Sequence, residues 1–181
     1  MTRPLIALLC VSTFVALARP AIAQDRRPLT VAVGMTTLSE DPPGAVFPSV
    51  DYDRGWAVSV SYTFLWDRLG AVADFGSNKR TNFFDEEQEL TYYLFGARYD
   101  LANWLGLVPY AVGLVGREKF TEPGLADEGT AFQVGGGVDA LLWKGIGARG
   151  EVDYQIVKYD GDQGRYRNWR IFVGGVVAIG W

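Results

Sequence analysis

The sequence predicts an all-β chain whose eight antiparallel strands close into an up-and-down transmembrane β-barrel. Two observations favour this fold. Apolar side chains alternate strictly with small or polar ones, which is typical of strands with two different faces. The pattern is clearest in 168–181, where Trp169, Ile171 and Val173 begin an apolar row. Long and short connections also alternate along the chain, as in barrels that have both termini on the periplasmic side.

The first 23 residues are expected to be a secretory signal peptide. Arg3 precedes an apolar run from Leu5 to Leu17, and the small-x-small sequence Ala21-Ile22-Ala23 follows. The run is shorter than the roughly 20 apolar residues of a membrane-spanning helix. We therefore expect cleavage before Gln24 and a single barrel domain over 24–181.

Composition excludes several classes of function. The chain has no histidine, and its one cysteine, Cys10, lies within the signal peptide. Disulfides, cysteine or histidine metal sites and Ser-His-Asp catalysis are thereby excluded from 24–181. The formal net charge is −4, or −6 without Arg3 and Arg19, and there is no basic cluster for nucleic acid. We predict a protein that is not an enzyme, with no cofactor, no metal and no nucleic-acid partner.

The first three strands are separated by one long loop and one short turn. Residues 29–36 alternate Leu, Val, Val and Met with Thr, Ala, Gly and Thr. The proline-rich stretch 39–54 follows and is expected to be a long loop. Residues 56–64 and 69–76 alternate in the same way on either side of a short turn at 66–68.

The next two strands follow a second long loop over 78–88, whose run of acidic residues we interpret as solvated. Residues 91–99 place aromatic and small side chains on one row, and 108–115 place Val, Tyr, Val and Leu on one row. The segment 100–106 is expected to be a turn. Pro109 cannot donate to the sheet, so it is expected near a strand end or at a bulge.

The last three strands begin after a third long loop, 117–128. Residues 132–142 and 146–156 alternate on either side of the tight turn Trp143-Lys144-Gly145, and a fourth loop over 158–165 leads to the C-terminal strand. Each predicted strand has roughly the 9–11 residues that a tilted membrane crossing needs.

Charged residues lie only on the rows opposite to the apolar rows. A cationic side chain that faces lipid costs roughly 2–4 kcal/mol at mid-membrane, so we expect these charges to point inward. Because buried charges need partners, we predict a structural ion-pair network that fills the lumen, with glycines leaving room for the longer side chains. The predicted network comprises Asp74, Arg98, Asp139, Arg149, Glu151, Asp153 and Arg170.

The tight turn predicts one pair of this network. If Trp143-Lys144-Gly145 is a three-residue loop with Gly145 at positive φ, Leu142 flanks Ile146 and Asp139 lies opposite Arg149. Aromatic residues near the strand ends are expected at the membrane interfaces. They are Trp56, Tyr99, Tyr154, Trp169 and Trp181.

Several of these segments resemble a known family. The segments 134–139 (Val-Gly-Gly-Gly-Val-Asp), 147–154 (Gly-Ala-Arg-Gly-Glu-Val-Asp-Tyr), 96–99 and 108–110 resemble the porin-like, OmpA-like class of eight-stranded outer-membrane β-barrel domains. The resemblance covers the chain from about Leu29 and implies that the protein lies in the bilayer of the cell outer membrane. The terminal Trp181 resembles the aromatic signal read by the outer-membrane insertion machinery, which is thereby an implied partner. Barrel enzymes of the outer membrane use a histidine, so no catalytic role is implied.

The sequence leaves three functions open. The first is a non-enzymatic barrel with a plugged lumen and a structural or adhesive role through its four long outer loops, whose external partners are unknown. The second is a narrow channel for small solutes or ions. The third is a soluble periplasmic barrel that binds a fatty ligand with its apolar rows turned inward. Eight apolar rows would overfill so small a lumen, which argues against the third.

Overall fold

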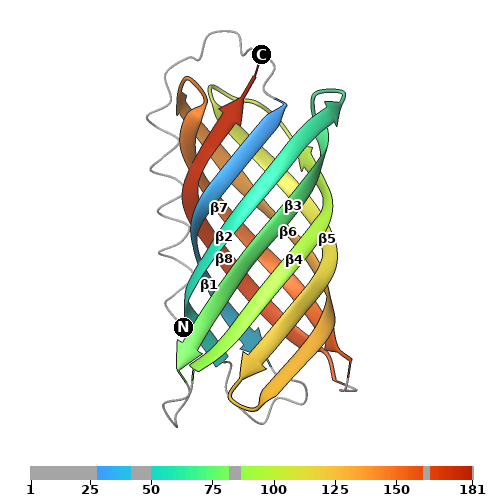
Figure 1. Cartoon of the computed structure of the whole chain (residues 1–181). Coiled ribbons are helices and arrows are strands. Elements are labelled where there is room, and N and C mark those ends of the chain that lie inside the picture. The colour runs from blue at the N-terminus through green and yellow to red at the C-terminus, as the bar shows by residue number, and fades with distance from the viewer. Residues whose placement is uncertain (1–27, 42–49, 82–86, 161–163, 181) are drawn as a thin grey trace, which may run out of the picture.

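The computed structural model describes residues 28–41, 50–81, 87–160 and 164–180, and these form one closed antiparallel barrel (Figure 1). Each strand pairs with its neighbours in chain order, and β8 pairs with β1. The eight strands of the described residues are β1 (Leu29–Asp41), β2 (Val50–Leu65), β3 (Leu69–Thr81), β4 (Glu87–Asp100), β5 (Leu107–Glu122), β6 (Leu125–Trp143), β7 (Ile146–Tyr159) and β8 (Tyr166–Ile179). The predicted all-β, eight-stranded, up-and-down barrel is therefore confirmed.

The two ends of the barrel differ. One end, here called the turn end, holds the connections β2–β3, β4–β5 and β6–β7 together with the start of β1 and the end of β8 (upper end in Figure 1). The opposite end is here called the outer end. Residues 1–27, which contain the predicted signal peptide, and Trp181 lie outside the described residues.

The strands extend further at the outer end than the sequence predicts. The predicted third loop is wrong, because Glu122 pairs with Leu125 and most of 117–128 continues the β5–β6 hairpin. The predicted loop 78–88 is shortened in the same way, since β3 runs to Thr81 and β4 begins at Glu87. Polar residues occupy both rows of these extensions, so the alternation of apolar and polar residues ends before the strands do.

The connections at the turn end are tight turns with left-handed residues. Lys144 and Gly145 have φ of 47° and 83°, as a two-residue type I′ hairpin requires. The predicted three-residue loop is thus wrong: Trp143 pairs with Ile146, and Leu142 falls at a register shift. The turn is one residue shorter than predicted, but the register shift at Leu142 leaves one extra residue in β6. The two effects cancel, so Asp139 pairs with Arg149 as predicted.

Outward side chains form an apolar belt around the barrel, with Phe132 57% and Val173 64% exposed. We take the strand portions that carry this belt as the membrane-spanning segments. They are 29–35, 56–64, 69–75, 93–99, 107–115, 132–142, 146–156 and 169–179. Beyond them, toward the outer end, the outward side chains become polar or charged, as at Lys79, Arg117 and Arg167. No helix of the described residues is long and apolar enough to cross a membrane.

Candidate functional site in the lumen

Arg170 on β8 lies at the centre of the lumen and is 1% exposed. Its guanidinium donates to Asp153 on β7 (Nε to Oδ2, 2.9 Å) and to Glu151 on the same strand (Nη2 to Oε1, 2.7 Å). It also donates to Asp74 on β3 (Nη2 to Oδ2, 2.7 Å) and to the Tyr92 hydroxyl on β4 (2.6 Å). Since β3 and β4 are not neighbours of β8, this one side chain spans the barrel interior.

A second ionic group lies nearer the turn end. Asp139 on β6 accepts two hydrogen bonds from Arg149, its cross-strand partner on β7, with N···O distances of 2.6 and 2.8 Å. Arg98 on β4 donates to the same carboxylate at 2.8 Å and to Asp100 at 2.8 Å. The Arg98 guanidinium also lies 3.7 Å from the centre of the Tyr110 ring. Two cations and an aromatic face therefore surround Asp139.

Glycine allows a side chain to reach past its neighbouring strand. The Tyr110 hydroxyl on β5 donates to Glu151 on β7 and so links the two ionic groups. Gly137 on β6 lies between them in the register, and a Cβ there would meet the Tyr110 hydroxyl at 2.6 Å. A similar arrangement holds at Gly76 on β3, where a Cβ would meet the Tyr92 hydroxyl. A larger residue at Gly76 or Gly137 would therefore block the bond that the neighbouring tyrosine makes.

The structure places all seven predicted charged residues within these two groups, each no more than 6% exposed. Tyr92, Tyr110 and Asp100 also belong to the groups, although the sequence analysis did not select them. Tyr92 lies on the same alternating row of β4 as Arg98, which is the signal that could have identified it. With the charges inside and the apolar rows exposed, the inverted soluble barrel is wrong.

An apolar cluster that the sequence analysis also missed lies in the lumen toward the outer end. Leu38 on β1, Tyr52 on β2 and Leu90 on β4 are each no more than 2% exposed and pack together, with Phe120 on β5 against them. The lumen thus holds apolar side chains near its outer end, and along the spanning segments it holds the ionic groups together with a second apolar cluster that includes Leu94, Leu114 and Phe172.

The predicted interface aromatics lie on the outward face where they are described. Trp56 and Trp169 are more than half exposed, and the Tyr154 ring lies 5.1 Å from the Trp169 ring. Tyr99 is also exposed and pairs with Leu69 beside the turn end. Trp181 lies outside the described residues.

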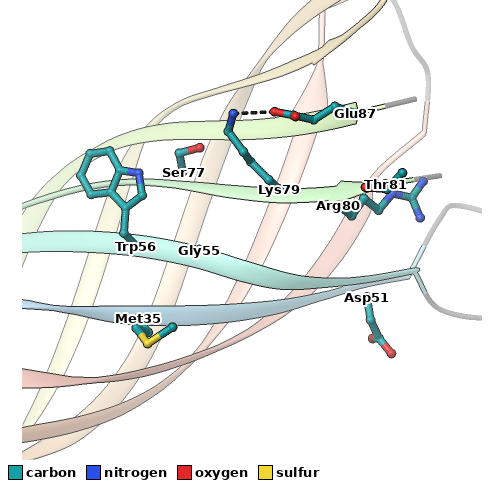
Figure 2. A pocket seen from close by; sticks show the side chains of 9 residues that line it. All are labelled: Met35, Asp51, Gly55, Trp56, Ser77, Lys79, Arg80, Thr81 and Glu87. Carbon is teal, nitrogen blue, oxygen red and sulfur yellow. Dashed lines mark hydrogen bonds and ion pairs between the residues drawn. The ribbon is translucent and has the colours of Figure 1, made fainter. Parts of the chain in front are cut away.

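A hollow of about 570 Å³ lies on the outer wall where the apolar belt ends. Figure 2 shows Met35 and Trp56 at one side and Arg80, Thr81 and Asp51 at the other, with Lys79 reaching Glu87. The Lys79 ammonium lies 2.5 Å from Glu87 and 3.5 Å from Glu89, and the hydrogen bond to Glu87 raises its pKa. Because Glu87 and Glu89 already neutralise the Lys79 cation, this ammonium has little attraction for an anion.

Comparison with known proteins gives one family and a group of similar structures. The family described as the outer membrane protein beta-barrel domain matches residues 6–176. The crystal structure of Neisserial surface protein A covers 83% of this chain and 97% of its own, with a TM-score of 0.69 and 13% identity. The attachment invasion locus protein of Yersinia pestis covers 83% and 99% (TM-score 0.53, 14% identity). OprG of Pseudomonas aeruginosa covers 87% and 98% (TM-score 0.53, 11% identity). No curated protein sequence matches the chain.

Proposed function

The chain belongs to the outer membrane protein β-barrel family, and from that premise we propose that it is a non-enzymatic barrel whose plugged lumen does not conduct. As a member of this family it is embedded in the outer-membrane bilayer. The observation that carries the proposal is the reach of Arg170 across the barrel to Asp74 and Tyr92. A side chain held by four partners across the interior supports a lumen that is closed at its level.

Two further features support a closed lumen. The bonds of Asp139 with Arg98 and Arg149 fill the interior nearer the turn end, and the cluster of Leu38, Tyr52 and Leu90 fills it toward the outer end. An ion that moved through would have to break charge-assisted hydrogen bonds in a medium of low dielectric constant, where such bonds are strongest.

Conductance of the refolded protein in planar bilayers tests this proposal. We expect no steady openings from the wild-type barrel. The double variant Arg170→Ser and Tyr92→Phe shortens the central side chain and removes one of its acceptors, so it should conduct more than the wild type. Steady openings from the wild type would reject the plugged lumen and favour the second candidate, a narrow channel for small solutes or ions.

The outer end supports the structural or adhesive part of the proposal. Extended strands, and not the long loops that the sequence predicted, form most of this end. The wall itself continues past the belt and carries exposed charges of both signs, including the cluster of Arg117 with Glu128 and Asp160. We propose that this wall, with the segments that join its strands, contacts molecules outside the cell. Cells that display the wild type should attach to negatively charged surfaces more strongly than cells that display Arg117→Glu with Lys119→Glu, at equal surface amounts. Equal attachment would leave only the structural role.

We also propose that the outer-membrane insertion machinery is a partner during assembly. The support is the apolar outward row of β8 and the aromatic residue Trp181 that follows this strand. Trp181→Ala should lower the amount of barrel in the outer membrane, measured by heat-modifiable gel mobility of membrane fractions.

A further inference from the structure

Four buried polar side chains lie between the central Arg170 group and the outer end. They are Glu118 on β5, Gln133 on β6, Gln155 on β7 and Asn168 on β8, here called the outer polar cluster. Each is no more than 1% exposed. Gln133 pairs with Gln155 and Gln155 pairs with Asn168, so three of the four lie in one row across neighbouring strands. The Gln155 side chain also acts on Glu118, which joins the fourth residue to this row, and all four side chains are closed to bulk solvent.

The cluster contains buried oxygens and amide nitrogens that make no hydrogen bond with any described residue. The oxygens are Glu118 Oε2, Gln133 Oε1 and Asn168 Oδ1, and the nitrogens are Gln133 Nε2 and Gln155 Nε2. The Gln155 oxygen accepts a bond from Asn168 at 3.4 Å. Buried polar atoms without a partner are rare and costly, so a group of them in one enclosed place points to a ligand.

Glu118 differs from the other carboxylates of the lumen because no Lys or Arg among the described side chains forms an ion pair with it. Its Oε1 accepts a hydrogen bond of 2.9 Å from the Tyr159 hydroxyl. This bond passes over Gly129 on β6, which pairs with both Glu118 and Tyr159. By contrast, Asp74, Asp139 and Glu151 each contact an arginine. A buried carboxylate with no cation must either hold a proton or take a cation from solution.

The groups around Glu118 do not supply that cation. Glu118 lies beyond the spanning portion of β5, and burial raises its pKa to about 7, with Glu40 on β1 adding to the rise while the Tyr159 hydroxyl and Gln155 oppose it. The charge of Arg80 on β3 acts on Glu40, and its guanidinium lies 5.0 Å from the Tyr52 ring while its Nε donates to Gln88. Above this pKa the Glu118 carboxylate is therefore an uncompensated charge.

We propose that the outer polar cluster binds one monovalent alkali cation, with the Glu118 carboxylate as the charged ligand and the Gln133 and Asn168 side-chain oxygens as neutral ligands. Hard cations take oxygen ligands of this kind. A single negative charge matches a single positive one, and no group of three acidic residues suited to a divalent ion is found among the described residues.

This site is a blind end and not part of a conducting path. Arg170 is the next inward residue after Asn168 on β8, toward the turn end, and its guanidinium would repel a cation that moved further. Entry is from the outer end, where Glu40 is partly exposed. The inference thus goes beyond the proposed function, and a closed lumen does not depend on it.

The test compares cations at one ionic strength. Refolded protein in detergent micelles is heated at pH 9 in sodium, potassium or choline chloride, and its unfolding midpoint is read from gel mobility. Choline cannot enter a site made of side-chain oxygens, so the midpoint should be several degrees higher in sodium or potassium chloride. Glu118→Gln should remove this difference. Glu128→Gln, on the outward wall, should retain it.

Two results would overturn the proposal. One is an equal midpoint in sodium, potassium and choline chloride, which would leave Glu118 holding only a proton. The other is a cation effect that persists in Glu118→Gln. If that variant does not refold, Gln133→Met removes one neutral ligand and keeps the carboxylate, and ²³Na line broadening by the wild type but not by Gln133→Met measures binding directly. Equal broadening by both proteins would again reject the site.

Discussion

The guanidinium of Arg170 and the carboxylate of Asp74 meet across the lumen, Nη2 to Oδ2 at 2.7 Å, although 96 residues separate them in the chain. Both side chains are almost fully buried, so neither can exchange its partner for water. Removing one member of such a pair lowers the free energy of unfolding by more than the intact pair contributes to it, because the other charge is left buried without a partner.

Arg170→Ala should therefore be among the most destabilising substitutions in the barrel. It leaves the carboxylates of Asp74, Glu151 and Asp153 without their shared cation, and we expect a loss of about 3–5 kcal/mol in the free energy of unfolding. Urea titration in detergent micelles measures it. Arg167→Ala, on the outward face of the same strand, is the control and should stay within about 0.5 kcal/mol of the wild type. Similar values for the two variants would contradict the central role of Arg170.

Gly137→Ala tests the passage of Tyr110 over β6. The added Cβ would lie 2.6 Å from the Tyr110 hydroxyl and 2.5 Å from the Gly150 carbonyl oxygen, so we expect a loss of about 1–3 kcal/mol from overpacking. Gly150→Ala, on the outward face of β7 with no atom within 4 Å, should instead be neutral or stabilise by up to about 1 kcal/mol. The same urea titration compares them, and a destabilised Gly150→Ala with an unchanged Gly137→Ala would refute the argument.

The alternation of residues was sufficient to predict the wall of the barrel. Parity along each strand assigns Asp139 and Arg149 to the inner face, and the short β6–β7 connection places them opposite one another. The bonds of Arg170 to β3 and β4 could not be predicted in this way, because they depend on how far the strands are staggered when the barrel closes. The outer parts of the strands escaped prediction because polar residues occupy both rows there, as in 117–122.

Val173→Arg tests the outward orientation of the apolar belt. Val173 is 64% exposed and lies midway along the spanning portion of β8, where an arginine facing lipid costs roughly 2–4 kcal/mol. The free energy of unfolding in lipid vesicles should fall by that amount. Thr121→Arg, exposed beyond the belt on β5, should have almost no effect. Equal effects at the two positions would show that the belt does not face hydrocarbon.

The stability of the barrel should fall as the pH rises through about 7, because burial raises the pKa of Glu118 from 4.5 to about 7. The folded state then binds the proton more tightly than the unfolded state does. This contribution is fully present below the unfolded pKa and is lost as the pH passes the folded value. The shift corresponds to on the order of 3 kcal/mol for a fully buried group.

Glu118→Gln removes this titration while it keeps the shape of the side chain. In choline chloride, which supplies no alkali cation, the wild type should lose stability between pH 5 and pH 9, and the variant should lose less. Some dependence should remain in the variant, because burial also raises the pKa of Glu40 to about 7, and Glu40 lies beyond the spanning portion of β1. Urea titrations at several pH values measure both slopes. A variant as sensitive to pH as the wild type would show that Glu118 is already ionised in the folded barrel at pH 5, and hence that a cation of the protein itself compensates it.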